Sequence, residues 1–102
     1  MALAFKSRSV RFDSTRDQRQ REPGSVNFGS AVRTAEASIK GYKVKFTGAD
    51  HPLHEIEVDI DDVTINGSNV TFNVDLVLRD RTGNYDDAYE GRVEVLIIAD
   101  LK

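Results

Sequence analysis

The amino-acid sequence predicts an all-β protein, an antiparallel two-sheet β-sandwich of six or seven strands. Apolar and polar residues alternate with a period of two over several stretches, which is the pattern of strands that bury one face. Short segments rich in Gly, Pro, Asn and Asp separate these stretches. No stretch clearly follows the period of an amphipathic helix. Two packed sheets are the architecture that such strands favour.

The N-terminal third is expected to hold a strand, a loop and a second short strand. The apolar residues of residues 3–12 change parity between Phe5 and Val10, which indicates one strand with an irregularity or two short pieces. Residues 13–25 carry no large apolar side chain and many Arg, Gln and Asp. Such a segment cannot bury a face, so we expect an exposed loop at about 13–25. Residues 26–29 then form a short strand.

Residues 31–39 allow two interpretations. Their alanines fit either a strand with small inward residues or a turn or two of helix. We favour the strand, because a clear alternation continues from Tyr42 to Phe46. The parity changes at residues 40–41, which predicts a β-bulge or a strand that crosses between sheets.

The clearest signal lies in the second half of the chain. An acidic strand with Ile56, Val58 and Ile60 on one face changes parity at residues 61–62. An Asn-Gly turn then leads into a long alternating strand at residues 70–78. Asn and Gly tolerate positive φ, so the pattern predicts an antiparallel hairpin.

The closing strand, at residues 92–99, is apolar on both faces. Leu96 and Ile98 lie on the face opposite the main apolar row, so a second sheet or another subunit should cover them. A polar loop at residues 79–91 precedes this strand. The predicted core consists of Phe46, Ile56, Val58, Phe72, Val74, Leu76, Val93, Val95 and Ile97.

Length and composition restrict the class of protein. The 102 residues fit a single domain, 1–102, that can fold without cross-links, and there is no Cys to form a disulfide. No apolar run has the length of a signal-peptide core or a membrane span. We therefore expect a protein that is cytoplasmic as synthesised, or released without a signal peptide, and that has no membrane span.

The formal charge of −3 is divided unevenly along the chain. Residues 1–33 carry seven basic and three acidic side chains, whereas residues 34–102 carry seven basic and fourteen acidic ones. Arg16, Arg19 and Arg21 would suit nucleic acid, but no aromatic platform accompanies them, so a solvated loop is favoured and no nucleic acid is expected. The division of charge favours head-to-tail or ring-like self-association.

The sequence does not favour an enzyme. It has no Cys and no Gly-x-Ser-x-Gly elbow, and its two histidines, His51 and His54, lie close together beside Pro52. With Asp50 or Glu55 they have borderline spacing for a Zn²⁺ site, but ordinary turn chemistry is the favoured interpretation. Paired carboxylates for glycoside hydrolysis would need a deep cleft, which so small a sandwich rarely forms.

The polar loop is the candidate binding segment. Its flat tyrosine faces and hydrogen-bonding groups are the mixture that binds a sugar ring and its hydroxyls. Tyr89 has an alternative role as an anchor for the final strand. The candidate ligand-binding residues are Arg81, Asn84, Tyr85, Asp86, Asp87 and Tyr89.

The same loop offers oxygen ligands for a hard cation. The candidate metal ligands are Asp80, Asn84 and Asp86, and Ca²⁺ is the ion that such groups suit. Their spacing does not match the twelve-residue loop of the helix–loop–helix Ca²⁺ motif. Side-chain hydrogen bonding in Asx turns is the alternative explanation.

The order of these elements resembles that of H-type lectin domains over residues 24–99. The features that carry the likeness are the run at 26–29, the Asp50-His51 turn before the acidic strand, the hairpin, and the ending at 93–99. The resemblance implies a six-stranded sandwich that forms trimers and binds galactose-type sugars between subunits. We therefore expect a non-catalytic, lectin-like module in a homo-oligomer, a trimer above all. The alternative is a structural or assembly subunit of a phage-tail or injection-type particle without a small-molecule ligand.

Overall fold

In the computed structural model the described residues, 2–15, 19–46, 53–80 and 88–102, form two antiparallel sheets of three strands each. This confirms the predicted all-β, two-sheet sandwich. Sheet A has the order β1-β6-β3, and sheet B has the order β2-β5-β4. The strands are β1 (Ala2–Thr15), β2 (Gln20–Asn27), β3 (Val32–Phe46), β4 (Leu53–Asn66), β5 (Asn69–Asp80) and β6 (Tyr89–Leu101). The described residues include no helix that could cross a membrane.

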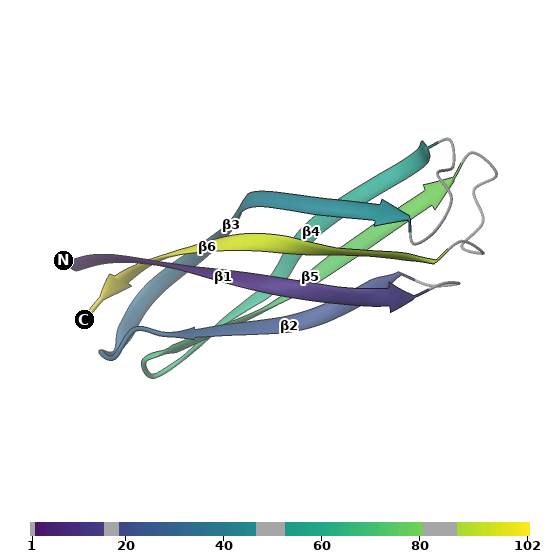
Figure 1. Ribbon diagram of the computed structural model, residues 1–102. Helices are drawn as coiled ribbons and strands as arrows, with labels where there is room; N and C mark the ends of the chain where they lie inside the picture. The colour runs from purple at the N-terminus through teal and green to yellow at the C-terminus, as the bar shows by residue number, and fades with distance from the viewer. Residues whose placement is uncertain (1, 16–18, 47–52, 81–87) are drawn as a thin grey trace.

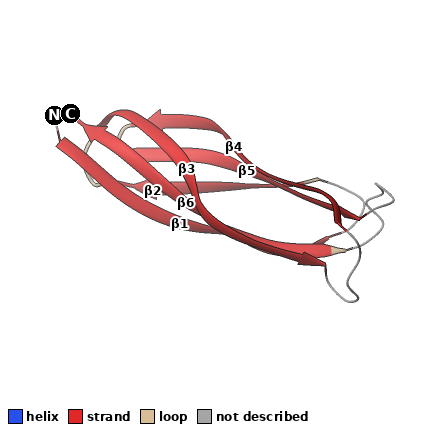
Figure 2. Cartoon of the chain, turned by 90° about the horizontal axis from the view of Figure 1, so that it is seen from above, coloured by secondary structure: helices blue, strands red, loops and turns tan. Residues whose placement is uncertain are grey.

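The two sheets pack face to face in an elongated molecule of 49 × 18 × 17 Å (Figures 1 and 2). The central strands, β6 and β5, each pair with two neighbours. Both chain termini lie at one end of the sandwich (Figure 1). The opposite end, which we call the loop end, gathers the strand ends Thr15, Gln20, Phe46, Leu53, Asp80 and Tyr89.

The core lies between the sheets and is formed mainly by alternate residues of β5 and β6. The prediction is confirmed for the buried residues Phe72, Val74, Leu76, Val93, Val95 and Ile97. Phe46 and Val58 are partly buried against this core. Ile56 was wrongly placed in the core, because it is 38% exposed. It pairs with Leu78 from the edge strand β4, where no further strand covers its open side.

The prediction of an exposed loop at about 13–25 is wrong for most of these residues. β1 continues to Thr15, and β2 pairs with β5 from Gln20 to Asn27. An edge strand needs backbone hydrogen bonds to one neighbour, so it forms here without a row of large apolar side chains. Pro23, which has no N–H to donate, is tolerated at such an edge.

The remaining parity changes have two different causes. Register shifts occur between Ile39 and Gly41 and between Asp61 and Thr64, which confirms the irregularities predicted at residues 40–41 and 61–62. In β1, by contrast, the register with β6 is regular from Ala2 to Phe12. The predicted irregularity there is wrong, because the apolar residues simply change faces: Leu3 and Phe5 point outward and are 60% and 61% exposed.

The predicted hairpin between β4 and β5 is confirmed. Asn66 pairs with Asn69, so Gly67 and Ser68 form a two-residue turn. Gly67 has a φ of 64°, and no such angle occurs at Ser68. A positive φ at the first central residue alone is the pattern of a type II′ turn, for which Gly is the preferred residue.

Candidate functional site

The predicted ligand and calcium residues of the polar loop fall largely outside the described residues. This holds for Arg81, Asn84, Tyr85, Asp86 and Asp87. Asp80 is the last residue of β5, and Tyr89 is the first residue of β6. Of the two histidines, His51 also lies outside the described residues, and His54 is in β4. The roles assigned to these loop residues stay predictions.

Tyr89 is a structural anchor. It is fully buried, and its hydroxyl donates a hydrogen bond of 2.9 Å to the carbonyl oxygen of Leu76 in β5. Its own carbonyl accepts a 3.0 Å hydrogen bond from the side-chain Nε2 of Gln20 in β2. This placement corrects the ligand-contact role, because a fully buried ring offers no face to a sugar in solution. It agrees with the alternative of an anchor for the final strand.

The outer face of sheet B is strongly acidic, and we call it the acidic face. Its carboxylates come from positions of β4 and β5 that alternate with the core residues; Asp59, for example, pairs with Asp75. Arg21 of β2 and Arg19, which directly precedes β2, lie against them. The carboxylates of the acidic face are Glu55, Glu57, Asp59, Asp61, Asp62 and Asp75.

Arg21 holds the centre of this face together. Its Nη1 donates to Asp75 Oδ1 at 2.8 Å, and its Nη2 donates to Asp61 Oδ1 and Asp62 Oδ2, both at 2.7 Å. The hydrogen bonds that Arg21 donates to Asp61 and then to Asp75 raise its pKa above the ordinary value. Arg19 pairs with Glu57 and lies 4.0 Å from Asp75 Oδ2. Two guanidinium groups thus flank Asp75, whose side chain is only 12% exposed.

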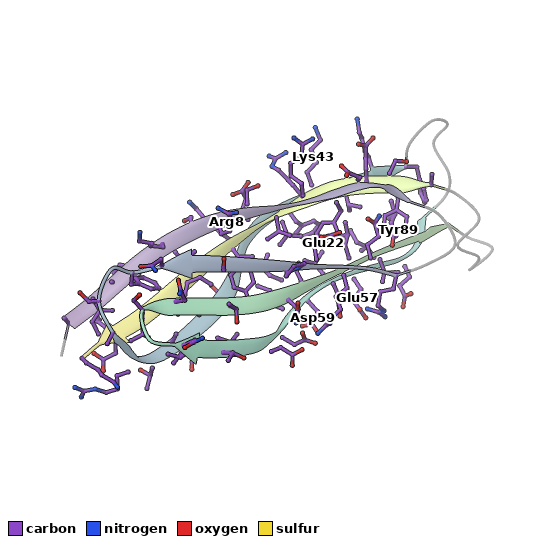
Figure 3. The ribbon with its side chains drawn as sticks, turned by 90° about the horizontal axis from the view of Figure 1, so that it is seen from below. Arg8, Glu22, Lys43, Glu57, Asp59 and Tyr89 are labelled. Carbon is purple, nitrogen blue, oxygen red and sulfur yellow. The ribbon has the colours of Figure 1, made fainter. Side chains whose placement is uncertain are left out.

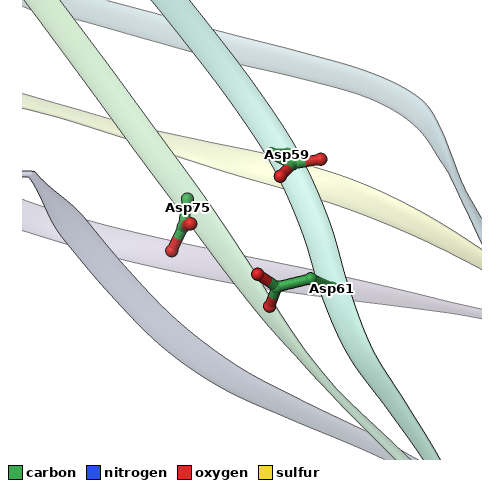
Figure 4. Close-up of side chains that lie close together, drawn as sticks. All are labelled: Asp59, Asp61 and Asp75. Atoms are coloured by element: carbon green, nitrogen blue, oxygen red, sulfur yellow. The ribbon is translucent and has the colours of Figure 1, made fainter.

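Three of these carboxylates are close enough to hold a metal ion. Oxygen atoms of Asp59, Asp61 and Asp75 all lie within 4.8 Å of one another (Figure 4). Two of the three already accept hydrogen bonds from Arg21, so a metal ion would have to displace a guanidinium group. We therefore interpret this cluster as an ion-pair network. The sequence analysis identified the acidic strand but missed the two arginines, because they were assigned to the loop.

The outer face of sheet A carries a groove of about 510 Å³ near the loop end. We call it the basic groove, after the cations that line it: Arg11, Lys43, Lys45 and Arg92. They come from three adjacent strands, since Arg92 of β6 pairs with both Arg11 and Lys43. Two carboxylates, Glu90 and Glu94, also line the groove, and Arg92 Nε donates to Glu94 Oε1 at 3.3 Å.

At the other end of the same face lies an apolar patch formed by Leu3, Phe5, Leu96 and Ile98. Phe5 pairs with Ile98, and Ile98 is 37% exposed. Because the patch lies on the outer face of sheet A, sheet B does not cover it. A depression of about 270 Å³ beside it is lined by Leu3, Ile98 and Asp100. The Oδ1 atom of Asp100 is buried and has no hydrogen-bond partner in the described part of the chain.

Comparisons of the chain with protein-family models, with curated proteins and with solved structures found no match. The H-type lectin resemblance therefore stays a prediction, and function has to be argued from the surfaces described above.

Proposed function

We propose that this chain is a non-catalytic, carbohydrate-binding module that works as a homo-oligomer. The observation that carries the proposal is the arrangement of strand ends. The ends that flank residues 81–87, namely Asp80 and Tyr89, lie at the loop end beside those that flank residues 47–52. The Tyr- and Asp-rich segment and the Asp50-His51 segment thus start and finish on one end of a rigid sandwich, where binding segments commonly gather.

The oligomeric part of the proposal is supported by the apolar patch. Leu3 and Phe5 are each about three-fifths exposed, and they adjoin Ile98 on one sheet face. Exposed apolar side chains that are contiguous usually mark a contact with another protein. The buried, unpartnered Oδ1 of Asp100 beside this patch points the same way, since such a group is normally satisfied. A trimer is the state that the lectin resemblance implies.

Sugar binding is tested with an array of simple saccharides, followed by calorimetry with galactose-type sugars, with and without Ca²⁺. We expect the parent to bind at least one of them. Asp86→Ala/Asp87→Ala should weaken that binding and leave the fold intact, because exposed loop substitutions usually change stability little. The control Asp13→Ala/Glu22→Ala removes two exposed carboxylates from β1 and β2, outside the acidic face, the basic groove and the apolar patch, and should bind as the parent does. Equal binding by both double variants would move the site elsewhere.

The second candidate function is a structural or assembly subunit. The observation that favours it is again the apolar patch, because a sheet face that needs covering is sufficient for assembly without any ligand. A parent chain that forms a stable oligomer but binds no saccharide, with or without Ca²⁺, would decide for this second function.

A further inference from the structure

We propose that copies of this chain dock heterologously, with the basic groove of one copy seated on the acidic face of the next. This inference rests on the homo-oligomeric part of the proposed function and identifies the two surfaces that meet. Figure 3 shows Lys43 on the opposite side of the molecule from Glu57 and Asp59. Each copy therefore presents one partner surface on each side.

The two surfaces have opposite charge. On the acidic face Glu55 pairs in register with Arg79, and the other five carboxylates stand against the two guanidinium groups of Arg19 and Arg21, which leaves a formal charge of −3. In the basic groove four cations stand against Glu90 and Glu94, which leaves +2. Opposite potentials of this kind steer encounters and fix their orientation.

The charges also match in spacing. Lys43 and Lys45 are two residues apart on the outer face of β3, and Glu57 and Asp59 are two residues apart on the outer face of β4. Along a strand this separation is about 6.6 Å. Two lysines of one copy can therefore approach two carboxylates of the next without a change in either backbone, and Glu57 keeps its ion pair with Arg19. Both strands lie at sheet edges near the loop end, where a neighbouring copy can approach.

The same charges oppose the symmetrical alternative. If two copies met through their sheet A faces at the groove, Lys43 and Arg92 would face the same cations of the other copy. Contact between two acidic faces would be repulsive as well. A heterologous contact remains, and such a contact closes into a ring when its rotation allows. A contact between opposite sides closes into the expected trimer only if each copy is turned by a third of a circle relative to the last, and otherwise it continues as an open stack.

The test uses two charge-reversed variants, and its readout is the mass in solution without any sugar. Lys43→Glu/Lys45→Glu disables the groove and keeps the acidic face, whereas Glu57→Lys/Asp59→Lys does the reverse. Each variant alone should fall to the mass of one chain, 11.4 kDa, in light scattering. An equimolar mixture should again form complexes larger than one chain, because the intact groove of one variant fits the intact acidic face of the other, and the two reversed surfaces are also opposite in charge. The parent oligomer should also dissociate as salt is raised.

The matched control for the groove variant is Arg33→Glu/Lys102→Glu, which makes the same change in net charge as Lys43→Glu/Lys45→Glu but at the end that carries the termini. It should keep the parent mass. The proposal is overturned if the groove variant keeps the parent mass, which would leave the groove to an anionic ligand, or if the mixture stays monomeric. A parent that is itself monomeric would overturn the oligomer as well, whereas the sugar-binding part is judged separately by calorimetry.

Discussion

Tyr89 and Asp75 are the two residues whose roles depend most on what surrounds them. Tyr89 follows the polar loop in the sequence, yet its ring is fully buried and its hydroxyl is bonded to Leu76. Asp75 lies on the outward row of β5, yet only 12% of its side chain is exposed, because Arg19 and Arg21 lie against it. In both cases a polar group is removed from water and gains a partner, as burial requires.

The anchoring role of Tyr89 predicts the effect of Tyr89→Phe. The variant keeps the ring but leaves the buried Leu76 carbonyl oxygen without its hydrogen bond, which should cost about 1–3 kcal/mol. Urea denaturation measures this loss as a lower midpoint. Any sugar affinity of the parent should be retained by the folded variant. An unchanged midpoint together with lost sugar binding would restore the ligand-contact role.

Among the elements, β2 is the one whose role in the core is easiest to test. Gly24 lies over the ring of Phe72 in β5, and a Cβ atom at this position would come within 2.5 Å of two ring carbons. The absence of a side chain at Gly24 therefore lets Phe72, which is only 1% exposed, fill the space between β2 and β5.

We expect Gly24→Ala to destabilise the protein by about 1–3 kcal/mol, because the added methyl group must displace a packed ring. Phe72→Ala should cost about 3–5 kcal/mol, since it removes a buried aromatic side chain. Combined in one chain, the two should cost less than their sum, because the shortened side chain makes room for the methyl group. Denaturation midpoints of the four proteins measure the coupling. Strict additivity would show that β2 does not pack on Phe72.

At the scale of the whole molecule, the two ends of sheet A's outer face differ in their chemistry, and this difference determines how the face can contact another copy. The end near the chain termini is apolar, with Leu3 and Phe5 exposed, and the loop end carries the basic groove. A contact that covers this whole face would combine apolar burial with charge complementarity, the two features that give an interface its affinity and its orientation.

Removing the apolar patch should therefore weaken self-association. Phe5→Ser/Ile98→Ser changes only outward side chains of sheet A and should lower the solution mass at micromolar concentration toward 11.4 kDa. Ile39→Ser is the control, since Ile39 is 41% exposed on β3, outside the patch, the basic groove and the acidic face. Light scattering at several concentrations measures both. If the patch variant kept the parent mass, the patch would lie outside the interface.

Local patterns in the sequence determined most of the architecture. The alternation at residues 70–78, the Gly67 turn and the irregularities at 40–41 and 61–62 predicted features that the structure contains. Such features follow from neighbouring residues, because the side-chain period and the allowed φ of a turn are properties of a few adjacent positions. The candidate binding segment was chosen in the same way, from its composition alone.

Only the tertiary structure decided which distant segments meet. Strand β2 has no apolar alternation, and it forms because β5 supplies backbone partners more than forty residues later in the chain. The same pairing brings Arg21 to Asp61 and Asp75, so residues that were assigned to a loop became the cations of the acidic face. The register of β1 with β6 likewise decides which side of β1 faces outward. Leu3 and Phe5 are exposed as a result. Pairing between strands is a long-range choice, and no short stretch of sequence contains it.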